Sequence, residues 1–272
     1  MSSACDSCPS KNGCTSQDSC PSLNKKVNEN IRKVIGIASG KDGVGKSYVT
    51  SALAAKLARQ GLKVGIMDAD VTGPSIPKAF GLKGMLRATE DNVMLPAETK
   101  SGIKVVSLNL LLKDEEAPVI WRGPVISGVI QQFWTDVDWG MLDVLLIDMP
   151  PGTGDVPLTV FQSIPLDGIV LVSTPQDLVS MIVSKARNMA QMMNVNILGL
   201  VENMSYIKCP HCDEKISLFG DDKALAEAAD KAGISILDRL PLDTAETAKI
   251  DGGNADDAGD GILDNTVKII TG

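Results

Sequence analysis

Two of the six cysteines in this 272-residue chain lie in the pentapeptide KCPHC, which ends at Cys212, with two residues between them. This C-x-x-C spacing lets the sulfurs of Cys209 and Cys212 face one metal ion or cluster. Two thiolates are only half of a four-ligand site, so the other half could come from elsewhere in the chain or, across a two-fold axis, from a second copy. Zinc remains an alternative to an iron–sulfur cluster, because the spacing does not select the metal. The only histidine, His211, could be a ligand or simply exposed.

The other four cysteines lie in the N-terminal segment CDSCPSKNGCTSQDSC and are Cys5, Cys8, Cys14 and Cys20. Four thiolates in a short polar segment could complete a 4Fe–4S or a zinc site by themselves. An unstructured tail that binds metal loosely is the alternative. We interpret residues 1–30 as a Cys-rich metal-binding tail and predict that residues 31–272 form the main domain.

A second chemical motif, GKDGVGKS, fits the phosphate-loop pattern G-x-x-x-x-G-K-[ST]. It follows the apolar run VIGIA and precedes a helical pattern, which is the context that the pattern requires. The glycines allow backbone N–H groups to surround phosphate oxygens, Lys46 would reach the β and γ phosphates, and Ser47 would ligate Mg²⁺. A glycine-rich turn without ligand is the alternative. The predicted nucleotide-binding residues of this loop are Gly40, Lys41, Asp42, Gly43, Val44, Gly45, Lys46 and Ser47.

Carboxylates follow two of the apolar runs. Asp68 and Asp70 end the run KVGIM, and Asp148 ends DVLLID in the place of a Walker B aspartate. The carboxyl ends of parallel strands border the nucleotide crevice, so one acid could hold Mg²⁺ while another orients the attacking water. The loop 152–154 could change shape when the γ-phosphate leaves. A helix cap, a turn or a plain strand end are the alternatives.

The elements that must position these residues alternate between strands and helices. We expect strands over residues 34–38, 63–67, 104–108, 143–148, 168–174 and 196–201. We expect helices over 47–59, with Gly61 at its C-terminal cap, and after Pro124 and Pro175. The acidic, Gly-rich stretch 251–262 is expected to be a loop. Repeated β-α alternation predicts an α/β fold with a doubly wound, mostly parallel sheet flanked by helices.

Composition excludes several classes of partner. The formal net charge is −8 and the isoelectric point is near 4.8, which argues against nucleic-acid binding and against attraction to anionic lipid. No secretory signal is recognisable, and the apolar runs are too short to span a bilayer. We therefore predict a cytoplasmic protein, in whose reducing compartment paired cysteines more often bind metal than form disulfides.

Taken in order, several motifs together resemble the Mrp/ApbC family of iron–sulfur carrier P-loop ATPases, in the subgroup with an N-terminal cysteine extension. The motifs are GKDGVGKS, DADVTGPSIP, WRGPV, DMPPGTGD, STPQDLV and VENMSY followed by CPHC. The resemblance extends from about Lys33 to the C-terminus. It implies an ATPase of the deviant Walker A type, with ATP and Mg²⁺ as cofactors. It also implies a homodimer that holds a 4Fe–4S cluster and passes clusters to apo iron–sulfur proteins.

The same resemblance implies roles for individual residues. Cys209 and Cys212 would bridge the cluster, Lys41 would reach the nucleotide of the other subunit, and Asn203 would contact adenine. Lys46, Ser47, Asp70 and Asp148 would serve the nucleotide.

The chain departs from the family pattern at two places. Asp42 stands where the family usually has glycine, and an acid near the triphosphate could weaken binding or slow hydrolysis. In the tail, Cys5, Cys8 and Cys14 match the family spacing, but its far-upstream cysteine is absent and Cys20 follows instead.

Other members of the same superfamily provide rival interpretations. A MinD-like membrane-cycling protein would need a basic amphipathic C-terminal helix, and a ParA-like partition protein would need a basic surface; this acidic chain predicts neither. An electron donor similar to the nitrogenase iron protein remains the main alternative, although the cluster cysteines of that protein are far apart in sequence.

Overall fold

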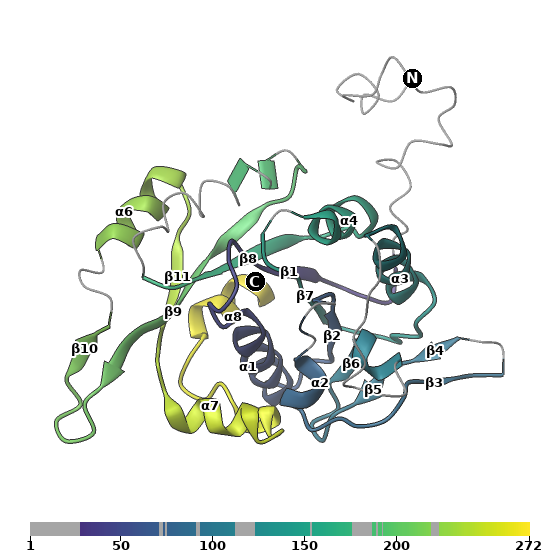
Figure 1. The fold of residues 1–272 in the computed structure, drawn as a ribbon, viewed down its shortest axis with the longest axis horizontal. Coiled ribbons are helices and arrows are strands. Elements are labelled where there is room, and N and C mark those ends of the chain that lie inside the picture. Colours follow the sequence, from purple (N-terminus) through teal and green to yellow (C-terminus); the bar gives the residue numbers. More distant parts are fainter. Residues whose placement is uncertain are drawn as a thin grey trace, which may run out of the picture.

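The computed structural model describes residues 28–70, 73, 75–90, 93–111, 123–152, 154–175, 187–188, 190–191, 193–218 and 223–272. Within these residues, a nine-stranded sheet has the strand order β10-β9-β8-β1-β7-β2-β6-β5, with β11 paired to β9 (Figure 1). The parallel strands are β1 (Val34–Ser39), β2 (Val64–Asp68), β6 (Lys104–Ser107), β7 (Val144–Asp148), β8 (Gly168–Ser173), β9 (Ile197–Lys208) and β11 (Ile236–Pro241). The antiparallel edge strands are β5 (Ala97–Glu98) and β10 (Lys215–Ser217). The predicted doubly wound, mostly parallel sheet is confirmed.

The central strands are apolar throughout because both of their faces are covered. Every residue of β1, β2, β7 and β8 is buried, which explains the continuous Val, Ile and Leu runs in the sequence. Their register aligns the carboxyl ends: Ile37 pairs with Asp148, and Asp148 pairs with Asp68 on the other side. Two acidic side chains therefore lie at the edge of the sheet where β1 leads into the glycine loop.

Helices cover the two faces of the sheet in separate layers (Figure 1). One layer contains α1 (Lys46–Arg59), α2 (Ile76–Ala79), α7 (Thr244–Asp251) and α8 (Asp264–Thr271); the other contains α3 (Gly123–Thr135), α4 (Asp155–Ser163) and α6 (Lys223–Ala232). Leu53, Leu57 and Val267 belong to the core beneath the first layer, whereas Phe133 and Phe161 belong to the core beneath the second. Shorter elements complete the described part of the chain, and they are β3 (Arg87–Ala88), β4 (Met94–Leu95), η3 (Leu108–Leu111) and η4 (Ala255–Asp257).

Most of the predicted elements occur at the predicted places. Helix α1 begins one residue before the predicted range, and Gly61 follows it with a φ of 85°, as a C-terminal glycine should. Helix α3 starts around Pro124 as predicted. The predicted strand 196–201 was too short, because β9 continues to Lys208 through a polar segment. The predicted loop 251–262 includes η4, whose Ala255 is fully buried.

Two predictions concern residues outside the described ranges. The Cys-rich tail, with Cys5, Cys8, Cys14 and Cys20, lies outside them, and so does the helix predicted after Pro175. The far C-terminus is described and is tied to the start of the domain, because Lys33 Nζ donates to the Ile270 carbonyl oxygen at 2.7 Å. Among the described residues, none of the helices has the length and apolar character needed to cross a bilayer.

Candidate nucleotide site and cysteine hairpin

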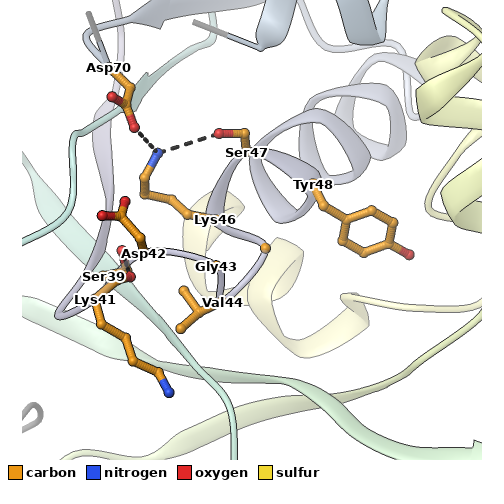
Figure 2. A pocket seen from close by; sticks show the side chains of 10 residues that line it. Ser39, Lys41, Asp42, Gly43, Val44, Lys46, Ser47, Tyr48 and Asp70 are labelled. Carbon is orange, nitrogen blue, oxygen red and sulfur yellow. Dashed lines mark hydrogen bonds and ion pairs between the residues drawn. The ribbon is translucent and has the colours of Figure 1, made fainter. Parts of the chain in front are cut away.

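The glycine loop lies between the end of β1 and the start of α1 and lines a cavity of about 210 Å³ (Figure 2). Gly43 and Gly45 have φ values of 75° and 78°, in the left-handed region that glycine adopts without steric cost. Ser39 Oγ donates to the Lys41 carbonyl oxygen at 3.0 Å and fixes the first turn of the loop. The loop therefore has the backbone that a phosphate cradle needs, at the amino end of a 14-residue helix whose dipole favours anions.

Lys46 is the buried cation at the centre of the site. Its Nζ lies 2.9 Å from Asp148 Oδ1 and 3.5 Å from Asp70 Oδ2, and it donates to Ser47 Oγ at 3.4 Å. Burial lowers the pKa of Lys46, but the surrounding carboxylates, with Asp148 the strongest, outweigh burial and leave the pKa above its ordinary value. The ammonium group is thus held charged, in place to meet a phosphate oxygen.

Asp148, at the end of β7, accepts hydrogen bonds from three side chains. Besides Lys46, Ser47 Oγ donates to Asp148 Oδ2 at 2.6 Å and Thr50 Oγ1 donates to Asp148 Oδ1 at 2.8 Å. The carboxylate is fully buried. A serine hydroxyl beside a carboxylate supplies hard oxygen ligands of the kind that Mg²⁺ prefers, so this pair fits the predicted metal position. Thr50 was not predicted from the sequence, although it lies one helical turn after Lys46.

Asp68, which ends β2, and Asp70, two residues later, make different contacts. Asp70 turns toward Lys46 (Figure 2), whereas Asp68 Oδ2 accepts from Ser107 Oγ at 3.0 Å and Asp68 Oδ1 accepts from the Asp70 N–H at 3.2 Å. Burial, together with the charge of Asp148, raises the pKa of Asp68 well above its ordinary value, against the opposing effects of Ser107 and Lys46. The prediction that both acids lie near the nucleotide loop agrees with this geometry, and Ser107 is a further residue that the sequence did not reveal.

Lys41 and Asp42 both line the cavity but point in different directions. In Figure 2 the carboxylate of Asp42 lies on the side of Lys46 and Asp70, whereas the side chain of Lys41 points the other way. Asp42 is exposed. The structure therefore places one unusual acid at the mouth of the loop, close to where the phosphates would lie.

Asn203 reaches the loop from β9. Its side chain is buried, and Nδ2 donates to the Val44 carbonyl oxygen at 2.9 Å. A Cβ atom added to Gly45 would lie only 2.2 Å from this nitrogen, so glycine is required there for space as well as for backbone conformation. The structure brings Asn203 to the predicted nucleotide loop, and its role toward adenine stays a prediction.

The pentapeptide KCPHC forms the tip of a hairpin between β9 and β10. The Cys209 N–H donates to the Glu214 carbonyl oxygen at 2.9 Å, and the Asp213 N–H donates back to the Cys209 carbonyl oxygen at 3.0 Å. Asp213 has a φ of 58°, which closes the turn. Cys209 is half-buried and Cys212 is exposed, and both are free thiols.

The turn also affects the ionisation of the Cys209 thiol. Hydrogen bonds from the backbone N–H groups of His211 and Cys212 to its sulfur lower the pKa of the Cys209 thiol, which favours the thiolate that binds metals. Within the described residues, no third His, Cys, Asp or Glu joins the pair to form a group that could hold a metal ion. Within the described residues, Cys209 and Cys212 could therefore supply two ligands only.

The fold and the loop together define a P-loop NTPase: a parallel sheet whose central strand leads through a glycine loop into a helix, with lysine and serine facing an aspartate of the next strand. The chain belongs to the family described as "ParA: NUBPL iron-transfer P-loop NTPase", whose model matches residues 30–269. The resemblance seen in the motifs is confirmed.

Individual relatives agree with this family. The chain is 45% identical over 268 residues to the "Iron-sulfur cluster carrier protein" of Clostridium perfringens, with 93% of this chain and 94% of that protein covered. It is 47% identical over 244 residues to the protein of the same name from Methanocaldococcus jannaschii, with 88% and 84% covered.

Solved structures show the same similarity. The nucleotide-binding protein of Archaeoglobus fulgidus in complex with ADP has a TM-score of 0.75 at 45% identity, over 84% of this chain and 89% of that one. The cell-division ATPase MinD of Pyrococcus furiosus shares the fold, with a TM-score of 0.56 at 20% identity over 88% of this chain and 96% of that one.

Proposed function

We propose that this chain is an ATP-dependent iron–sulfur cluster carrier that holds a 4Fe–4S cluster between two copies of itself and transfers it to apo-proteins. The observation that carries the proposal is a pair of free thiols, the half-buried Cys209 and the exposed Cys212, in a hairpin of the same sheet from which the phosphate loop leads. Two thiolates from each of two chains would supply four equivalent ligands. The carrier and transfer proteins among its relatives support this assignment.

An exposed hairpin suits a cargo better than a resident cofactor. Cys212 is exposed and Cys209 half-buried, so an acceptor could approach the cluster directly once the two chains separate. Their sulfurs are the soft ligands that iron–sulfur clusters and zinc both accept. Zinc binding is therefore measured alongside iron in the test below.

The nucleotide would occupy the cavity lined by Gly43, Gly45 and Lys46. Loop N–H groups and Lys46 would bind the phosphates, Ser47 and Asp148 would hold Mg²⁺, and Asp70 would orient water for hydrolysis. Mg²⁺ would supply charge neutralisation of the phosphates. Hydrogen bonds to charged groups contribute about 1.5–3 kcal/mol each, so a few of them reach the roughly −8 kcal/mol of a micromolar complex.

The resemblance to the family implies roles for two further residues. Lys41 would contact the nucleotide of the second copy, and Asn203 would contact adenine. The direction of the Lys41 side chain, away from Lys46 in Figure 2, is compatible with a reach beyond its own site. ATP binding would then tighten the dimer, and hydrolysis would relax it and release the cluster.

The test compares wild type with the Cys209→Ala/Cys212→Ala variant after anaerobic reconstitution. Iron, sulfide and zinc contents are measured together with native mass. We expect the wild-type dimer to carry about four more irons than the variant, because the bridging cluster needs both thiol pairs. A Cys14→Ser variant is the control for the tail and should keep these irons and the dimer.

Transfer is then followed to an apo-ferredoxin. Recovery of its cluster spectrum, with loss of iron from the donor, supports the carrier. Stable redox cycling without loss of iron would instead indicate an electron donor. Equal metal content in wild type and the double variant, or tight stoichiometric zinc alone, would overturn the proposal and make the hairpin a structural element.

A further inference from the structure

Strand β9 connects the phosphate loop directly to the cysteine hairpin. Asn203 contacts Val44 of the loop at 2.9 Å, and Cys209 follows Lys208, the last residue of the same strand. Cys209 is only six positions after Asn203, so the two residues are at most about 20 Å apart along the strand. Both residues belong to one continuous run of chain, formed by β9 and the residue after it.

The strand is irregular at the point where it meets the loop. Arg239 of β11 pairs with Glu202 of β9, and Pro241 of β11 pairs with Tyr206 of β9. Strand β9 therefore has two more residues than its neighbour here, and these form a bulge over residues 203–205. Met204, at its centre, has a φ of 55°, a left-handed conformation that costs energy for a residue with a side chain.

The bulge points two consecutive side chains at the same loop residue. In a regular strand, successive side chains lie on opposite faces. Here a Cβ atom at Gly45 would lie 2.2 Å from Asn203 Nδ2 and 3.7 Å from Met204 Cε, so both side chains reach the glycine loop. Next to them, the buried hydroxyl of Ser205 makes no hydrogen bond to any of the described residues. The bulge is a strained and incompletely satisfied structure held against the loop.

Beyond the bulge, Tyr206 is tied both to the residue after β11 and to β10 of the cysteine hairpin. The Tyr206 carbonyl oxygen accepts from the Leu242 N–H at 2.8 Å, and Tyr206 pairs with Ser217 of β10. Lys215 Nζ lies 4.5 Å from the centre of the Tyr206 ring. Tyr206 and the hairpin that carries the cysteines therefore form one packed unit.

We propose that the bulge of residues 203–205 couples the nucleotide loop to the cysteine hairpin, a role that rests on the nucleotide binding proposed above. A shift of the Val44 carbonyl when phosphates bind moves Asn203, and the left-handed Met204 backbone converts that shift into a reorientation of the unit that begins at Tyr206. Asn203 and Met204 are positioning residues in this scheme. Since coupling is reciprocal, metal loading at Cys209 and Cys212 changes nucleotide affinity by the same factor.

The test measures the alkylation rates of Cys209 and Cys212 on the full-length, metal-free chain. Iodoacetamide is the probe, and peptides are resolved by mass spectrometry with and without saturating Mg-ADP or a non-hydrolysable ATP analogue. We expect nucleotide to change the rate at the hairpin by about fivefold or more in wild type. Nucleotide binding is titrated on the same samples. If nucleotide does not bind, the proposed function fails; if it binds and the thiols do not respond, only the coupling is overturned.

Three variants separate the bulge from general loosening. Met204→Gly removes the backbone constraint and should reduce the response to less than about twofold while the chain still binds nucleotide. Met204→Asn keeps a residue that tolerates the left-handed region and should retain the response. Asn194→Gly is the matched control, because Asn194 has a φ of 53° but lies outside the bulge.

The variant outcomes decide the proposal as follows. A full response in Met204→Gly, or a lost response in Asn194→Gly, overturns the coupling role. Equal loss in Met204→Asn and Met204→Gly assigns the effect to the side chain and also overturns it. Should Met204→Gly fail to fold, hydrogen exchange of wild type decides: residues 205–217 must change protection with nucleotide while the β3–β4 ribbon does not.

Discussion

The Nζ of Lys46 lies 2.9 Å from Oδ1 of Asp148, and both side chains are almost entirely buried. The pair joins the first residue of α1 to the last residue of β7, so the proposed phosphate-binding cation and the proposed Mg²⁺ carboxylate position each other. The pKa of Lys46 is higher in the folded chain than in the unfolded chain. The charged side chain therefore contributes its full stabilisation below the pKa of the unfolded chain, and this contribution is lost when pH rises through the higher pKa of the folded chain.

Replacing Lys46 should therefore affect both nucleotide binding and stability. In Lys46→Ala we expect nucleotide affinity to fall by about 100-fold and the free energy of unfolding to fall by about 2 kcal/mol, because Asp148 loses its buried cation. Isothermal titration and denaturant unfolding measure the two effects. Reconstituted iron content should stay unchanged. The exposed Lys83→Ala is the control for charge, and normal nucleotide binding by Lys46→Ala would contradict the assignment.

Asp68 should make stability depend on pH. Its folded pKa lies well above the unfolded one, so the folded chain binds the proton more tightly, and stability falls as pH rises from the unfolded toward the folded value. In Asp68→Asn the side chain does not ionise, and its amide oxygen can still accept a hydrogen bond from Ser107. The variant should therefore gain stability relative to wild type as pH rises above the unfolded carboxyl pKa, which is about 3.9.

Thermal unfolding of both proteins at several pH values measures this difference. Asp136→Asn, at an exposed site beyond α3, is the matched control for the Asp-to-Asn exchange. A variant that loses stability relative to wild type as pH rises would show that Asp68 is charged and stabilising in the folded chain.

The sequence predicted the parts of the site that depend on local pattern. Continuous apolar runs gave the buried strands, and the spacing of Gly40, Gly45 and Lys46 gave the phosphate loop between strand and helix. Asp148 was predicted because it directly follows an apolar run. These features need only neighbours in sequence to be recognised.

The parts that were missed depend on contacts between distant segments. Strand β9 continues past Val201 through the buried Glu202, whose Oε2 accepts from Arg239 Nε at 2.7 Å, 37 residues away. The left-handed Met204 breaks the alternation that would mark a strand. Thr50 and Ser107 serve the carboxylates through hydroxyl groups that have no distinctive spacing. Sequence periodicity cannot report such pairings.

Gly45 and Asn203 should show measurable steric coupling. Gly43→Ala and Gly45→Ala share the same positive φ, which costs about 1–2 kcal/mol for alanine. Nothing lies within 4 Å of a Cβ at Gly43, whereas a Cβ at Gly45 meets Asn203 Nδ2. We therefore expect Gly45→Ala to lower the free energy of unfolding by about 1 kcal/mol more than Gly43→Ala.

A double-mutant cycle with Asn203→Ala tests the cause of that difference. The Gly45→Ala/Asn203→Ala variant should lose less stability than the two single variants added together, because the clash disappears with the amide. Denaturant unfolding of the four proteins gives the coupling energy. Additive losses would mean that the contact does not limit residue 45.

Asp42 should weaken nucleotide binding through its charge. It stands at the mouth of the loop on the side of Lys46 and Asp70, where its carboxylate repels phosphate oxygens (Figure 2). Two unit charges 4 Å apart in water interact with an energy of about 1 kcal/mol. Removing the Asp42 charge in Asp42→Asn or Asp42→Gly should therefore raise Mg-ATP affinity by about fivefold. The gain should shrink as ionic strength increases, because salt screens exposed charges.

Titration of nucleotide at two salt concentrations measures this effect of the Asp42 charge. Asp136→Asn is the control, because it changes the net charge by the same amount as Asp42→Asn. If only Asp42→Gly binds more tightly, backbone freedom rather than charge is the reason; if neither does, the carboxylate does not face the phosphates in the complex.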